Sequence, residues 1–172
     1  MDYEPIEARR AIAGDSAKHR TPVSLPPQVP FRSRRWPTLI APVWVIESVE
    51  HGAQISDASI RKAREVIEIH ADAVRRAVAA GVKVAMGTDA GVGPHGDNLR
   101  ELGLLERAGM TPTTALQSAT QEAARLLGVD ETLGTIEEGK TADLVVVGGD
   151  PLQFDGWAGR VEQVWLGGTR RV

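Results

Sequence analysis

The clearest hydrophobic pattern lies between Ser56 and Gly81, where apolar residues recur at steps of three and four. This spacing is typical of a helix with one apolar face. Ser56 or Asp57 can cap the first turn, and Gly81 suits the end. We therefore predict a helix here, with an apolar face made by Ile60, Ala63, Val66, Ile67, His70, Val74 and Val78.

Two more helices are predicted in the middle of the chain. The first begins at Asp97 or Asn98 and runs to Ala108, with Gly109 closing it. The second begins at Thr111-Pro112, with threonine as N-cap and proline in the first turn, and runs to Leu127 before Gly128.

Runs of apolar and β-branched residues predict strands. A short run over residues 37–46 is interrupted by Pro42, which removes a ladder donor, and Val82–Met86 follows the first helix directly. A Gly-rich loop of residues 87–96 comes next. Short strands are predicted near the end of the chain, over residues 134–136, 142–147 and 161–166, with turns at 138–140 and near 148–151.

The order of these elements indicates an α/β protein followed by a separate β-layer. Residues 1–36 show neither helical nor strand periodicity, and residues 18–35 hold four of the ten prolines. We expect residues 1–36 to be a disordered or non-homologous segment.

Composition narrows the function classes. The net charge of -3 provides no basic field for nucleic acid or anionic lipid. The chain has no cysteine, so a metal site would need His, Asp, Glu or a modified Lys. No apolar run approaches the roughly 18 residues of a membrane span, and the N-terminus lacks the layout of a signal peptide. The expectation is a soluble protein, cytoplasmic by default.

Several motifs together resemble the amidohydrolase superfamily, most closely its imidazolonepropionase-like and prolidase-like branch. The stretch Gly81–Gly91, with Pro94-His95-Gly96 and Asn98, is similar to the last barrel strand of those enzymes and the loop after it. Motifs further along resemble the exit from the barrel into a small β-sandwich: Gly109–Pro112, Ala115-Leu116, Ala119-Thr120, Ala123-Ala124, Leu127-Gly128, Gly134–Ile136, Gly139-Lys140, Ala142–Val145 and Asp150-Pro151.

The resemblance implies a (β/α)8 TIM barrel that holds divalent metal, zinc first among the candidates, and hydrolyses amide, cyclic amide or dipeptide C–N bonds. A complete barrel needs about 250 residues. On this reading, residues 37–130 are the terminal part of the barrel, with its last one or two strands, and residues 131–172 are strands of the β-sandwich. The family's paired first-strand histidines have no counterpart, so we expect an incomplete metal site in a truncated chain.

Asp89 is the principal candidate for catalysis and metal binding, because it follows a predicted strand and opens the Gly-rich loop. A carboxylate there can bind a metal and take a proton from its water. By resemblance, it would then pass the proton to the leaving nitrogen. The alternative is that Asp89 only caps or braces a turn.

His95, in the same loop, is a candidate substrate-binding residue that could orient substrate or donate to an oxyanion, and it could equally brace the loop. His70 is expected in the core, while His19 and His51 are expected on the surface. The four tryptophans are interpreted as core or edge packing.

Two functions follow from these observations. The first is a metal-dependent hydrolase of small-molecule amides, inactive as this chain alone. The alternative is a non-catalytic module that associates with a complementary chain or with a second copy of itself, because a barrel-derived strand would leave unpaired edges.

Overall fold

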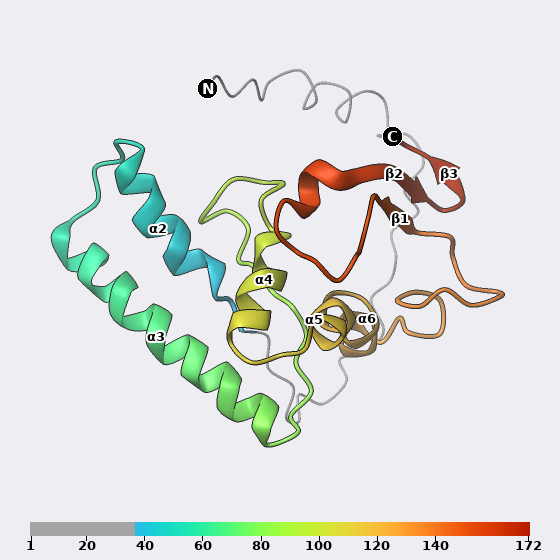
Figure 1. The fold of residues 1–172 in the computed structure, drawn as a ribbon, viewed down its shortest axis with the longest axis horizontal. Helices are drawn as coiled ribbons and strands as arrows, with labels where there is room; N and C mark the ends of the chain where they lie inside the picture. The colour runs from blue at the N-terminus through green and yellow to red at the C-terminus, as the bar shows by residue number, and fades with distance from the viewer. Residues whose placement is uncertain (1–36) are drawn as a thin grey trace. The chain divides into compact units, whose positions relative to one another are not determined.

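The structure is a computed structural model, and it describes residues 37–172 (Figure 1). Residues 1–36, on which the expected disordered or non-homologous segment, His19 and Trp36 fall, lie outside the described residues. The elements are α2 (Ile40–Glu50), α3 (Asp57–Ala79), α4 (Arg100–Arg107), α5 (Pro112–Ala119), α6 (Gln121–Leu127), β1 (Leu144–Val147), a 3₁₀ helix (Trp157–Arg160), β2 (Val161–Leu166) and β3 (Thr169–Arg170).

Helix α2 stands where a strand was predicted over residues 37–46, so that prediction is wrong. Pro42 lies in the first turn of α2, where backbone N–H groups have no partner inside the helix. The N–H groups of Leu39 and Ile40 instead donate to the Glu101 carboxylate at 2.7 to 3.1 Å. The cap of α2 therefore comes from a residue 61 positions further along the chain.

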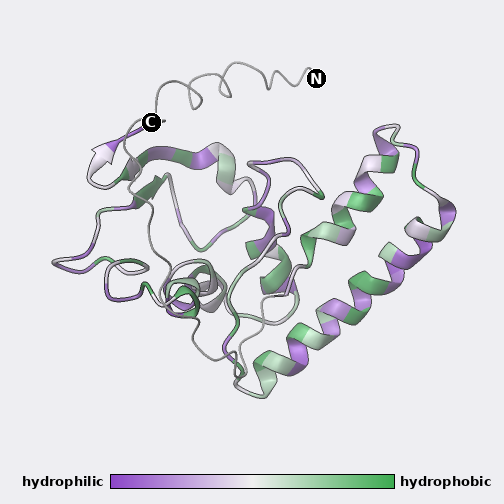
Figure 2. Cartoon of the chain, turned by 180° about the vertical axis from the view of Figure 1, so that it is seen from behind, coloured by the Kyte–Doolittle hydropathy of each residue, from purple (hydrophilic) through white to green (hydrophobic). Residues whose placement is uncertain are grey.

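Helix α3 confirms the prediction made from apolar spacing. Ser56 is its N-cap and accepts from the Ser59 N–H at 3.2 Å, and Gly81 follows its end with a positive φ of 70°. Hydropathy alternates along the helix, which is the long one at the edge of Figure 2. Only Ala63 and Val74 of its residues are buried, however, and the side chain of Ile69 is 58% exposed. The apolar face of α3 is thus only partly covered by the described residues.

Helix α4 begins slightly later than predicted. Asn98 provides no side-chain cap, and the turn over residues 97–102 is held by 3.2 Å bonds from Arg100, Glu101 and Leu102 to the carbonyls three residues earlier. The helix ends at Arg107, with Gly109 at φ 104° two residues later, as the sequence indicates.

The helix predicted from Thr111 to Leu127 is divided into α5 and α6 at Thr120. Its start is confirmed, because Thr111 Oγ1 accepts from the Thr114 N–H at 3.2 Å. Its end is confirmed too, because Gly128 is the left-handed C-cap. The break has a tertiary cause: the Ser118 carbonyl accepts a hydrogen bond from the Met86 N–H at 2.9 Å instead of from an N–H of a continuous helix.

The hydrophobic core gathers around α4. Leu102 and Leu105 are fully buried, and they pack with Val74, Val84, Met110, Ala115, Phe154 and Trp157 in one cluster. Of the tryptophans within residues 37–172, Trp44 and Trp157 are buried and Trp165 is partly buried, which confirms the packing roles predicted for these three.

The strands form one antiparallel sheet in the order β1-β2-β3, with Leu144 opposite Trp165 and Leu166 opposite Thr169. The predicted last strand, residues 161–166, is confirmed as β2, and the strand expected over residues 142–147 is shorter by two residues. Residues 134–136 form a loop, so the strand predicted there is wrong. Lys140 Nζ holds this loop by donating to the Asp130 carbonyl and to Thr135 Oγ1.

Within residues 37–172, the helices are too short or too polar to cross a membrane.

Candidate active site

Residues 82–88 lead into the candidate site as an extended segment. Val84 and Ala85 are buried, but Val84 forms only an isolated β-bridge, and the β1-β2-β3 sheet does not include this segment. The strand predicted over Val82–Met86 is therefore absent as a regular element, because a strand needs a neighbouring strand for its ladder of hydrogen bonds. It is linked to the described helices by backbone bonds from the Val82 N–H to the Ala77 carbonyl of α3 and from the Met86 N–H to the Ser118 carbonyl of α5, each at 2.9 Å.

Asp89 follows this segment and has an unusual backbone. Its φ is 50°, the only positive value at a non-glycine residue in the described part of the chain. Such a conformation is uncommon, Asp tolerates it better than most residues, and it gathers at functional positions and in turns. The Val92 N–H donates to the Asp89 carbonyl at 3.1 Å, so Asp89 does begin a turn. Its side chain is exposed and makes no hydrogen bond with another described residue.

Asp89 also lines a cavity of about 1120 Å³. The cavity is bordered by α3, by residues 82–87 and by α6, and its wall is mostly apolar, with Val82, Val84, Met86 and Leu126 among the lining residues. Small-molecule sites are typically apolar cavities of about 300–1,000 Å³ with a few polar groups. The polar side chains here are those of Thr38, His70, Arg76 and Asp89. The arrangement can therefore accept a small molecule with one carboxylate at its rim.

The three histidines of residues 37–172 are all exposed. His95 is exposed and is not one of the residues that line this cavity. His70 is exposed rather than in the core, and its Nδ1 lies 3.4 Å from the Thr38 carbonyl at the cavity wall. The core prediction for His70 is wrong because the apolar face of α3 is incompletely covered here. His51 is exposed as expected, with Nδ1 2.7 Å from the Glu47 carbonyl.

A complete metal centre is not formed by residues 37–172. No three His, Asp or Glu side chains among them lie close enough to hold an ion. Asp89 is the only residue with a carboxylate side chain among the described residues that line the cavity. Because a catalytic zinc takes about three protein ligands, the described residues do not fit a whole metal site, although Asp89 can provide one oxygen ligand.

Glu101 is a buried acid that the sequence analysis did not single out. Its side chain is fully buried, and burial raises its pKa to about 7, while the hydrogen bonds from Leu39 and Ile40 act in the opposite direction. The sequence did contain a signal: Glu101 lies one helical turn before Leu105, on the apolar face of α4. A charged residue in that position indicates a buried partner.

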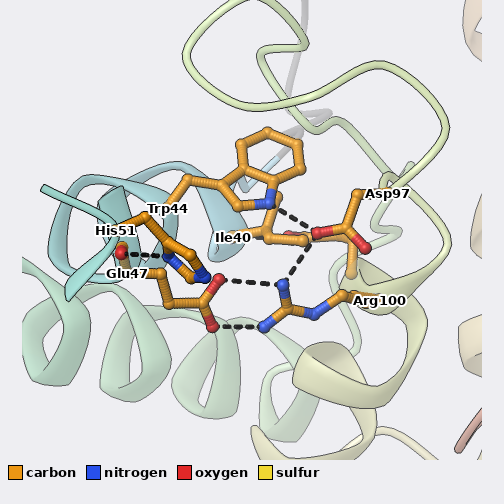
Figure 3. Close-up of polar contacts among 7 residues, drawn as sticks. Ile40, Trp44, Glu47, His51, Asp97 and Arg100 are labelled. Atoms are coloured by element: carbon orange, nitrogen blue, oxygen red, sulfur yellow. Dashed lines mark hydrogen bonds and ion pairs between the residues drawn. The ribbon is translucent and has the colours of Figure 1, made fainter. Parts of the chain in front are cut away.

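A polar group beyond the cavity was also not predicted. Trp44 and Glu47 of α2 meet Asp97 and Arg100, which lie at the end of the loop that carries Asp89 (Figure 3). These residues are separated by 53 positions along the chain, so no local pattern indicates the contact.

Comparisons with known proteins show the family to which the chain belongs. Residues 3–171 match the model of the amidohydrolase family. A crystal structure of a Xaa-Pro dipeptidase with bound methionine in the active site is 37% identical, with a TM-score of 0.70, and the match covers 80% of this chain and 34% of that one. Imidazolonepropionase of Geobacillus kaustophilus is 32% identical over 163 residues, covering 84% of this chain and 37% of the relative. Ochratoxinase of Aspergillus niger is 34% identical over 105 residues, covering 60% and 22%.

The mixed α/β chain is similar to solved amidohydrolases of TIM-barrel type. The chain is a member of the amidohydrolase family. It spans about a third or less of the length of the dipeptidase and ochratoxinase it matches. Members of this family are typically metal-dependent.

Proposed function

We propose that this chain supplies the terminal portion of a hydrolase barrel that cleaves C–N bonds in amides, cyclic amides or dipeptides. Asp89 is the residue to which we assign the chemistry. The observation that carries the proposal is its position: Asp89 lies four residues after the buried Val84-Ala85 pair and lines the 1120 Å³ cavity. Family membership supports the reaction class.

In the proposed reaction, the Asp89 carboxylate accepts a proton from the attacking water and returns it to the leaving nitrogen. Its exposure and its freedom from hydrogen bonds to other described residues leave both oxygens available for this role. To His95, which lies six positions further along the same loop and is exposed, we assign contact with a substrate that extends out of the cavity. The metal ligands beyond Asp89 are assigned to residues that these 172 residues do not include.

The substrate class is a small molecule with an amide-type bond. The cavity has an apolar wall for a side chain or ring and a few polar groups near its rim. The names of the similar proteins, a Xaa-Pro dipeptidase and an imidazolonepropionase, point to dipeptides and cyclic amides as the first compounds to test.

The first experiment assays the purified 172-residue chain, with added zinc or manganese, against dipeptides, cyclic amides and lactones. We expect no turnover, since one carboxylate does not hold a catalytic metal. Clear turnover by this chain would contradict the assignment of the remaining ligands to other residues.

The second experiment transfers residues 37–172 into the Xaa-Pro dipeptidase in place of its matched third. If the chimera hydrolyses dipeptides, Asp89→Asn should lower kcat by about 10²–10⁴-fold, the usual worth of a general acid–base residue. Asp155→Asn is the matched control, because Asp155 is exposed and does not line the large cavity. Equal activity of the two variants would remove Asp89 from the chemistry.

A second candidate function is that of a non-catalytic module that binds a complementary chain. The observation that favours it is the exposure of large apolar side chains: Leu127, which lines the cavity, is 60% exposed, and Ile69 of α3 is 58% exposed. Apolar surface of this kind marks association sites. Size-exclusion chromatography with light scattering tests this candidate, and a monomer that shows no binding to the remaining part of a relative would argue against it.

A further inference from the structure

The loop that carries Asp89 is attached to helix α2 at its far end. Trp44 Nε1 donates to Asp97 Oδ2 at 2.8 Å, and the Arg100 guanidinium donates to the same carboxylate oxygen at 2.7 Å. Arg100 also forms two bonds to the Glu47 carboxylate, at 2.9 and 2.5 Å (Figure 3). We call these four residues, Trp44, Glu47, Asp97 and Arg100, the clasp.

Backbone packing adds a second attachment at Gly93. A Cβ atom placed on Gly93 would overlap the Cγ, Cδ2 and Cε3 atoms of the Trp44 ring. The loop backbone therefore runs against the face of this indole, and only glycine permits such an approach. Trp44 itself is 3% exposed, so its ring is held firmly by α2 and its surroundings.

The loop has little internal structure to hold its shape. Within residues 87–98 the backbone bonds are Val92 N–H to the Asp89 carbonyl and Asp97 N–H to the Pro94 carbonyl, at 3.1 and 3.4 Å. Four of the ten residues from 87 to 96 are glycines, which lose the most conformational freedom on ordering. Contacts from outside the loop must therefore supply most of what orders it.

We propose that helix α2 positions the loop of residues 87–99 through the clasp and the Trp44–Gly93 contact, and thereby places Asp89 at the cavity. Trp44 and Arg100 are positioning residues in this arrangement. The ion pairs of Arg100 are about half exposed and weak one at a time. Arg100 shares the Asp97 carboxylate with the buried indole and also binds Glu47, so the group acts as one unit. Only the catalytic meaning of the clasp rests on the proposed function.

The test measures backbone ¹⁵N order parameters of the loop by NMR in the full chain, and no turnover is required. In the wild type we expect values near 0.85 for residues 88–96, as in a rigid backbone. Arg100→Met and Trp44→Phe, which remove the shared donors of Asp97, should lower them below about 0.6. Arg100→Lys should restore them in part, since lysine keeps the charge without the fork.

The Trp44 indole N–H signal is a second readout. Asp97→Asn should move it upfield, because a neutral amide is a weaker acceptor than a carboxylate. Order parameters of α6 serve as the internal control. Unchanged loop values in folded Arg100→Met and Trp44→Phe variants would overturn the proposal, whatever the outcome of the activity assays.

A double-variant cycle tests the Gly93 contact. Gly93→Ala should displace the loop resonances in the wild-type background and have little effect beside Trp44→Leu, where the ring is gone. Gly159→Ala is the matched control, because a Cβ there meets open space and its φ is not in the left-handed region. Equal effects of Gly93→Ala in both backgrounds would contradict the contact.

Discussion

Helices α3 and α4 have similar amphipathic sequences, but the structure uses them differently. In α4, Leu102 and Leu105 are 1% and 0% exposed, and even the carboxylate of Glu101 is enclosed and capped to α2. In the much longer α3, only two residues are buried, and Ile69 is 58% exposed. Part of α3, from His70 to Ala77, borders the cavity that Asp89 lines.

An apolar stripe shows which face of a helix can be buried, whereas the neighbouring elements decide whether that face is buried. Helix α4 has neighbours on several sides, namely α2, α5 and the Phe154–Trp157 turn. The cavity side of α3 has none among the described residues that covers it fully. The stability of this chain should therefore depend on α4 far more than on the apolar face of α3.

The largest expected effect is on the α4 side of the comparison. Leu105→Ala should lower the free energy of unfolding by about 2–5 kcal/mol, because it leaves a cavity in the core. Ile69→Ala on α3 should change it by less than about 0.5 kcal/mol, since the side chain is already largely in water. Urea titrations followed by circular dichroism measure both. Similar losses of unfolding free energy in the two variants would contradict the expected difference between α4 and α3.

Glu101 provides the next largest effect, a pH dependence. Its folded pKa of about 7 exceeds its ordinary value of 4.5, so the folded state binds the proton more tightly. Its contribution to stability is fully present below pH 4.5 and falls as pH rises to about 7, by about 3 kcal/mol in total.

Glu101→Gln removes this titration and leaves Arg100 and all other acidic residues unchanged, so it isolates the effect of Glu101 on the pH dependence of stability. The difference in unfolding free energy between wild type and variant should shift by about 3 kcal/mol toward the wild type on going from pH 7 to pH 4.5. Parallel stability curves for the two proteins over this range would show that Glu101 does not titrate as its burial implies.

The smallest effect concerns the cap of α5. Thr111→Ala should cost about 1 kcal/mol, since Thr111 Oγ1 accepts from the Thr114 N–H. Thr113→Ala is the matched control, an exposed threonine of the same helix without a capping bond. An equal loss of unfolding free energy in the two variants would mean that the Thr111 capping bond does not stabilise the protein.

Much of the local structure could be predicted from the sequence. The start of α3 at Ser56, the start of α5 at Thr111-Pro112 and the bounds of β2 all follow from capping residues and β-branched runs. The expected site residue Asp89 does lie at a cavity, after an extended segment. These features depend on interactions between residues close together in the chain, which a sequence pattern records.

The errors share one physical cause, a partner distant in sequence. Helix α2 replaces the strand predicted over residues 37–46 because Glu101 caps the first N–H groups of the helix. Helices α5 and α6 are separate because the Ser118 carbonyl accepts a hydrogen bond from the Met86 N–H. The burial expected for His70 failed because the neighbours of α3 do not cover it. None of these contacts leaves a periodic trace in the sequence.

By itself the sequence determined where helices and turns can begin, which faces are apolar, and that a carboxylate opens a glycine-rich loop. Only the tertiary structure decided that α4 would be enclosed and α3 left open, and that the loop of Asp89 would rest on Trp44. Capping and periodicity act over a few residues, whereas burial and loop position depend on which surfaces meet after the chain has folded.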